Sequence, residues 1–134
     1  MENCLFCKII NGEVPSYKIY EDDDTYAFLD ISKDVDGHTL VLSKHHCKNI
    51  LDADDKILSS VMKTVKKISN HYINNCGYDG VNIISYANEA AEQVIMHIHI
   101  HIIPRKKEDG LILSPSLNAS KLTLEEAFKK FKLD

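Results

Sequence analysis

The chain has 134 residues, 44% of them hydrophobic, and a formal net charge of -4 at pH 7. This length suits one domain with a single core, and no apolar run approaches the roughly 18 residues of a membrane span. The polar start does not resemble a signal peptide, and the negative charge argues against general attraction to nucleic acid or an acidic membrane. We therefore expect a cytoplasmic protein that holds any anionic substrate through local groups.

The first motif is the pair Cys4 and Cys7, which precedes the first expected regular element. A Cys-x-x-Cys spacing alone is compatible with zinc, with redox chemistry or with neither. Redox pairs usually lie at a strand-to-helix turn of a βαβ unit, which the following residues do not indicate. Cys47 and Cys76 stand alone, and without a secretion signal we expect inert thiols rather than disulfides.

Residues 17–20 and 26–29 are rich in aromatic and β-branched side chains, which predicts a β-hairpin with an acidic loop between its strands. The three aspartates of that loop could suggest a metal, but a charge run at a turn is usually a solvated tip, and we favour that interpretation. By residue type alone, Phe28 and Ile31 would belong to the core.

A further strand is expected over residues 38–43, followed by a long helix that begins at Asp52, carries Asp55 in its first turn and ends at Gly77. Apolar residues recur along this helix at steps of three and four, which predicts one face packed on a sheet. These residues are Leu58, Val61, Met62, Val65, Ile68 and Tyr72.

Residues 81–85 predict the next strand, and residues 86–92 a loop that leads to the most distinctive segment, Met96 to Pro104. There histidine alternates with isoleucine, so His97, His99 and His101 should share one strand face. Successive imidazoles would lie about 6.6 Å apart, close enough to address one phosphate-sized group. A zinc site built from the three imidazoles is a rival interpretation, and a purely structural role is a weaker one.

Residues 111–118 read as irregular, and Thr123 with Glu126 forms a capping box for a short final helix. Together the elements predict an α+β fold: an antiparallel sheet with one long helix and a short C-terminal helix. We expect one domain over residues 1–134, with a core of about 3–105 and a C-terminal tail of 106–134. The tail could pack on its own subunit or on a partner.

Several of these segments together resemble the signature of the histidine triad (HIT) superfamily of nucleotide hydrolases and transferases, in its bacterial Hint-like branch. The resemblance covers about Asn3 to Arg105, most of the chain, and implies a HIT-like fold and a homodimer. It rests on the stretch from Gln93 to Arg105, and on residues 4–10, 11–15, 28–31 and 37–42 in the same order and spacing.

The resemblance also implies a reaction. His99 would attack the α-phosphate of a purine nucleoside phosphoramidate or a related nucleoside monophosphate derivative, and water would then hydrolyse the nucleotidyl-histidine. His101 would assist the leaving group, His97 and His38 would orient the set, and Gln93 would position the phosphate. No catalytic metal is required by this scheme.

Further residues take roles from the same resemblance. Phe28 and Ile31 would contact the base, and Asp30 the ribose hydroxyls. A structural zinc would be held by Cys4, Cys7, His46 and His97, with unmetallated cysteines as the alternative.

The chain departs from the family pattern before the triad. Tyr86, Glu92 and Val94 occupy places where relatives usually have Asn, Gly and a polar residue, and Asn88, two places late, is the candidate replacement for the Asn in binding nucleotide. A carboxylate at Glu92 about 4 Å from a phosphate would cost on the order of 1–4 kcal/mol. These departures keep open a nucleotide-binding or interaction protein with little turnover. Two other rivals are a diadenosine polyphosphate hydrolase and a metalloenzyme that uses the triad as ligands.

Overall fold

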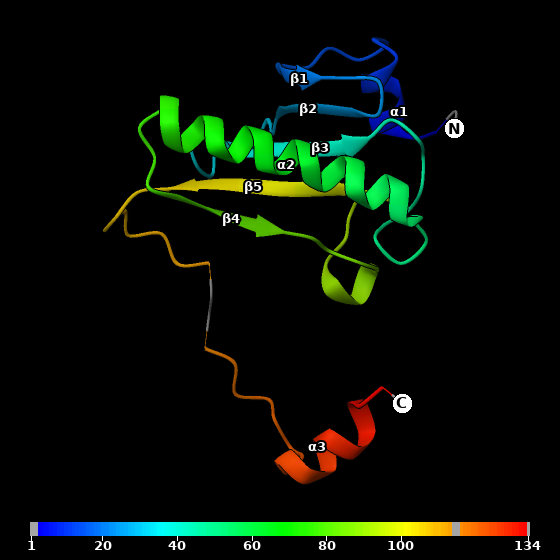
Figure 1. Ribbon diagram of the computed structural model, residues 1–134, viewed down its shortest axis with the longest axis vertical. Coiled ribbons are helices and arrows are strands. Elements are labelled where there is room, and N and C mark those ends of the chain that lie inside the picture. The colour runs from blue at the N-terminus through cyan, green and yellow to red at the C-terminus, as the bar shows by residue number, and fades with distance from the viewer. Residues whose placement is uncertain (1–2, 114–115, 134) are drawn as a thin grey trace.

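The computed structural model describes residues 3–113 and 116–133. Five antiparallel strands form one sheet in the order β1-β2-β3-β5-β4, and the long helix α2 lies across one face of it (Figure 1). The α+β fold expected from the sequence is thus confirmed. The strands are β1 (Lys18–Glu21), β2 (Thr25–Leu29), β3 (Thr39–Ser43), β4 (Gly80–Ile84) and β5 (His99–Arg105), and the helices are α1 (Leu5–Ile10), α2 (Asp55–Asn75), the 3₁₀ turn η1 (Glu89–Ala91) and α3 (Leu124–Phe131).

Helix α2 begins later than expected. The carboxylate of Asp54 accepts the N–H of Ile57 at 2.8 Å and caps the helix. Asp52, the expected first residue, instead accepts the backbone N–H groups of Lys48 and Asn49 at 3.0 Å each. Its carboxylate therefore stabilises the turn before the helix, and the prediction of a start at Asp52 was wrong.

The main core lies between α2 and the sheet. Val61, Val65, Ile68 and Tyr72 of α2 pack on Ala27, Val41, Ile100 and Ile102 of the strands. Met62, expected in the same stripe, is 48% exposed and points away from the core. Removing the packed side chains from water is the main favourable contribution to this layer.

The opposite face of the sheet is covered near β2 and β3 by helix α1, which the sequence analysis did not predict. Phe6 and Ile9 of α1 pack on a second buried cluster that includes Phe28 and Leu40. A helix of six residues is too short to show a periodic apolar stripe, so tertiary packing rather than local pattern determines it. Its position places α1 beside the histidines of β5.

The acidic hairpin tip between β1 and β2 is organised by Asp22. Its carboxylate accepts the backbone N–H groups of Asp24 and Thr25 at 2.8 Å each, and the hydroxyl groups of Thr25 and Tyr20. These bonds within the turn support the interpretation of the run as a loop tip.

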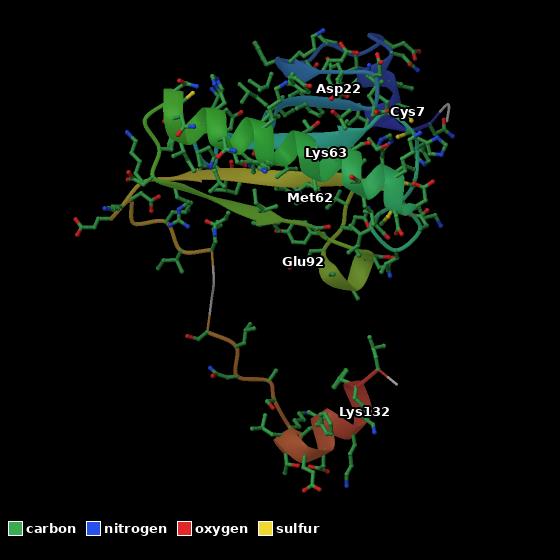
Figure 2. All side chains as sticks on the ribbon, viewed as in Figure 1. Cys7, Asp22, Met62, Lys63, Glu92 and Lys132 are labelled. Carbon is green, nitrogen blue, oxygen red and sulfur yellow. The ribbon has the colours of Figure 1, made fainter. Side chains whose placement is uncertain are left out.

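Helix α3 stands apart from the sheet and α2 (Figure 1), and Lys132 marks its end in Figure 2. The capping box of Thr123 and Glu126 is present, as expected. Residues 111–113 and 116–118 are irregular, while 114 and 115, also expected to be irregular, lie outside the described residues. No helix in the described ranges is both long and apolar enough to span a membrane.

Candidate functional site

The histidine-rich segment does not form one continuous strand. Strand β5 begins at His99, whereas His97 lies in a bend before it, so the expected strand from Met96 to Pro104 is only partly correct. The reason is a different set of hydrogen bonds: the N–H of Ile98 donates to the carbonyl of Cys47 at 2.8 Å, and Nε2 of His97 donates to the carbonyl of Ser43 at 2.7 Å. This geometry turns His97 away from the other two histidines.

His99 has the features of a nucleophile. Its Nδ1–H donates to the carbonyl oxygen of His97 at 2.7 Å, so Nε2 keeps its lone pair. The ring meets the ring of Phe6 edge to face, with centroids 4.9 Å apart. Burial lowers the pKa of His99 below its ordinary value, which keeps the imidazole neutral at neutral pH.

His101 lies beside a second histidine. Nδ1 of His101 is 2.9 Å from Nε2 of His38, and Nδ1 of His38 is 3.0 and 3.1 Å from the two carboxylate oxygens of Asp34. Burial, with the neighbouring His99 and His38, lowers the pKa of His101 to about 4. Burial alone would raise the pKa of Asp34, but the hydrogen bonds from His38 and the Val35 N–H hold it below its ordinary value.

A cavity of about 290 Å³ opens next to these histidines and is lined mainly by apolar side chains. Its walls come from α1, the following turn, β2 and β3, and include Phe6, Phe28, Leu40, Ile31 and Asp30. Phe28 is buried, but Ile31 is 87% exposed at the cavity, so the expectation that Ile31 belongs to the core was wrong. The Ile31 side chain is therefore accessible both from solvent and from the cavity that it lines.

Asp30 connects the cavity to the histidines. Its Oδ1 accepts the N–H of Ser32 at 2.8 Å, and its Oδ2 lies 3.8 Å from Nε2 of His38. The carboxylate thus stands between the apolar cavity and the His38 imidazole.

Gln93 is buried, and protein partners use its whole side-chain amide. It donates to the carbonyl groups of Lys48 and Ile95 at 2.7 and 2.9 Å, and its Oε1 accepts from Asn49 and from the Asn88 N–H. Asn88 accepts a second hydrogen of Asn49 at 3.1 Å. Gln93 and Asn88 thus brace the loop before β5. The sequence analysis did not predict the role of Asn49, because Asn49 belongs to no recognised motif.

This loop carries unusual backbone conformations. Glu92 has φ 72 and ψ 23, the left-handed region, and Asn88 has φ 75 and ψ 162. Each such residue costs of order 1–3 kcal/mol and persists where the surroundings impose it. Glu92 and Val94 are both exposed on the loop, where Figure 2 labels Glu92, whereas the ring of Tyr86 contacts that of His101 edge to face at 5.3 Å.

A second cluster forms from Cys4, Cys7, His46 and His97, whose ligand atoms all lie within 4.8 Å of one another. Nδ1 of His97 is 3.4 Å from Sγ of Cys4, 3.5 Å from Sγ of Cys7 and 3.1 Å from Nδ1 of His46. A tetrahedral zinc gives edges of about 3.3 Å between two nitrogens and about 3.6 Å between nitrogen and sulfur, so these residues fit the ion. Cys7 lies in α1 and Cys4 caps it, rather than both preceding a regular element as expected.

The second cluster also bears on the rival three-histidine metal site. His97 directs Nε2 to the Ser43 carbonyl and Nδ1 to the cysteines. His99 instead donates Nδ1–H to the backbone of His97. The structure therefore does not bring the three imidazoles together as ligands of one ion.

Comparisons with known proteins agree with this arrangement. The sequence model of the family described as HIT domain matches residues 11–108. An uncharacterized HIT-like protein of Borreliella burgdorferi is 48% identical, over 99% of this chain and 96% of its own length. The adenosine 5′-monophosphoramidase of Candida albicans is 38% identical, over 79% of this chain and 72% of its own.

Solved structures of the same family have a similar fold. A HIT family member from Bacillus subtilis superposes with a TM-score of 0.82 at 35% identity, over 98% of this chain and 99% of that one. A zinc-bound histidine triad family protein from Mycobacterium smegmatis has a TM-score of 0.79 at 31% identity, over 87% of this chain and 85% of that one.

Proposed function

This chain belongs to the HIT family, and from that premise we propose that it hydrolyses or transfers nucleotides at the α-phosphate of purine nucleoside phosphoramidates or related nucleoside monophosphate derivatives. The observation that carries the proposal is the neutral His99, with its tautomer fixed by the His97 carbonyl, beside an apolar pocket that ends in Asp30. The phosphoramidase activity named for the Candida albicans relative supports the substrate class.

The reaction proceeds in two steps. Nε2 of His99 forms a bond to phosphorus as the phosphorus–nitrogen bond breaks, and the electron pair of that bond leaves with the amine, which takes a proton from His101. Water then attacks the nucleotidyl-histidine and releases the nucleoside monophosphate. Phe28 and Ile31 hold the base, and Asp30 accepts hydrogen bonds from the ribose hydroxyls.

Gln93 and Asn88 contribute through the loop that they brace. Because the amide of Gln93 is used by four protein groups, its role is to hold the backbone before β5 rather than to donate to the phosphate. His97 acts in the same indirect way, since its carbonyl orients His99. Gln93 and His97 therefore contribute by fixing the position of the reacting groups rather than by contact with the phosphate.

A structural zinc is proposed for Cys4, Cys7, His46 and His97, which have the donor set and spacing that the ion prefers. When bound, the zinc would neutralise the thiolates and cross-link α1 to the segment before β5. The chemistry at phosphorus uses the histidines alone.

We also propose a homodimer. Strand β4 is an edge of the sheet with Ile83 41% exposed, and α3 exposes Leu124, Phe128 and Phe131. Exposed apolar groups and a free strand edge are features that association commonly covers.

The test is amine release from adenosine 5′-phosphoramidate, with and without a chelator, by the wild type, His99→Ala and His45→Ala. His45 is an exposed histidine outside both clusters, so its variant controls for loss of an imidazole as such. We expect chelator-resistant turnover that falls on the order of 10³-fold or more in His99→Ala and stays unchanged in His45→Ala. Turnover that survives in His99→Ala, or nucleotide trapped on another residue, would overturn the assignment.

A second candidate function is nucleotide binding with little turnover. It is favoured by the departures at Glu92 and Tyr86, of which the first carries a negative charge on the strained loop and the second contacts His101. Equal and tight adenosine monophosphate binding by wild type and His99→Ala, with no turnover in either, would support this function instead.

A further inference from the structure

Three side chains form a continuous row that ends at the proposed acid. The carboxylate of Asp34 accepts Nδ1–H of His38 through both of its oxygens, at 3.0 and 3.1 Å. On the other side of the ring, Nε2 of His38 is 2.9 Å from Nδ1 of His101. A carboxylate can only accept, so the bond fixes a hydrogen on Nδ1 of His38.

The row begins at the surface and runs into the protein. The Asp34 side chain is 53% exposed, whereas the His38 side chain is 9% exposed and has Oδ2 of Asp30 3.8 Å from its Nε2. Two carboxylates thus lie near opposite nitrogens of a buried imidazole, Asp34 at Nδ1 and Asp30 at Nε2. His101, next in the row, keeps Nε2 for the reacting groups.

We propose that Asp34 is a positioning residue that holds His38 protonated at Nδ1, so that His38 and His101 pass one proton to the leaving group and take it back from water. The inference rests on the proposed function, since it concerns the proton transfers of that reaction. In this scheme Asp34 orients His38, His38 gives the proton to His101, and His101 gives a proton to the leaving group.

The proton balance closes over the two steps. As the phosphorus–nitrogen bond breaks, Nε2–H of His101 moves to the leaving amine, and the proton on Nε2 of His38 moves to Nδ1 of His101. His38 is then neutral, with Nδ1–H still bound to Asp34. When water attacks the nucleotidyl-histidine, its proton goes to Nε2 of His101, Nδ1–H of His101 returns to His38, and the bond between phosphorus and His99 breaks with its electron pair left on His99.

The same loop offers a matched control. Asp36 is also an exposed aspartate two residues further along, and it makes no side-chain hydrogen bond to any described residue. Asp34→Ala and Asp36→Ala therefore remove the same charge from the same loop, and only the first removes the contact with His38.

The experiment has two readouts on the full chain. One is the ¹⁵N shift of His38 Nδ1 without substrate, assigned with a His38→Gln sample, and the other is kcat and KM for adenosine 5′-phosphoramidate. We expect Asp34→Ala to move Nδ1 towards the unprotonated shift and to lower kcat about tenfold or more with little change in KM, as for residues that orient another ligand or base. Asp36→Ala should match the wild type in both readouts.

Two results would overturn the proposal: a kcat of Asp34→Ala within about twofold of that of Asp36→Ala, or a fall in kcat with the His38 shift unchanged. A wild type without turnover would instead count against the proposed function. In that case the ¹⁵N shift still tests whether Asp34 holds the proton on His38, which keeps the two failures distinguishable.

Discussion

Two histidines of this chain differ in which ring nitrogen donates a hydrogen bond, and this gives them different chemistry. A backbone carbonyl takes Nδ1–H of His99 and leaves Nε2 nucleophilic, whereas another carbonyl takes Nε2–H of His97 and leaves Nδ1 to face two thiols. Three residues of one type at one spacing therefore fall into two sites. The choice is made by which acceptor lies within 3 Å of each nitrogen.

At the same scale, Glu92 offers a test of backbone strain. Glu92→Gly should raise the free energy of unfolding by about 0.5–1 kcal/mol. Glycine adopts φ 72 without the steric penalty that a Cβ brings, and this penalty is larger than the entropic cost of ordering glycine. Glu89→Gly, three residues earlier in η1, should lower it by about 0.5–1 kcal/mol, since its backbone is helical. Urea unfolding measures both, and equal losses in the two variants would argue against strain at Glu92.

At the scale of elements, α1 links the cluster of Cys4, Cys7, His46 and His97 to the apolar cavity beside His99. Cys4 caps this helix and Cys7 lies in its first turn, and Phe6, between them, packs against His99 and lines the cavity. Anything that loosens the cysteine end of this short helix should therefore disturb the cavity wall as well. An isolated helix of six residues has little stability of its own.

Cys4→Ser tests this link. We expect the wild type purified without chelator to contain one zinc per chain, and the variant to lose it, to unfold at least about 5 °C lower and to bind adenosine monophosphate more weakly. Cys76→Ser is the control, because Cys76 is an exposed thiol at the end of α2, far along the chain from the cluster. Metal analysis, thermal unfolding and calorimetric titration measure the three effects; a metal-free wild type would contradict the prediction.

At the scale of the whole molecule, the C-terminal helix adds no core to the domain. Leu124 is 90%, Phe128 66% and Phe131 71% exposed, although the helix carries a complete capping box. The described residues of one chain leave the apolar side chains of α3 in water. Further contacts would be needed to bury them.

A chain ending after Leu113 should therefore keep its unfolding midpoint within about 3 °C of the full chain. A chain ending after Arg105 should lose more, because Asp109 and the Leu111 carbonyl both bind the Arg105 guanidinium. Thermal unfolding at matched concentration measures the midpoints, and sedimentation equilibrium shows whether the full chain has twice its 15.2 kDa mass. A midpoint that falls equally in both truncations would show that the tail supports the domain.

The sequence by itself determined whatever depends on local periodicity and chemistry. Three local patterns predict the α+β class and the main elements, because each is complete within a short stretch of chain. They are the apolar stripe of α2, the alternation of β5 and the Thr123 capping box. The family motifs predict His99 as the nucleophile, and the comparisons confirm the family.

Only the tertiary structure decided how residues distant in the chain combine. The break before β5, helix α1, the bracing by Asn49 and the row from Asp34 to His101 all depend on hydrogen bonds or packing between segments far apart or in irregular loops. No local pattern reports such contacts, because a ring nitrogen or a short helix takes its partner from whatever group the fold brings within reach.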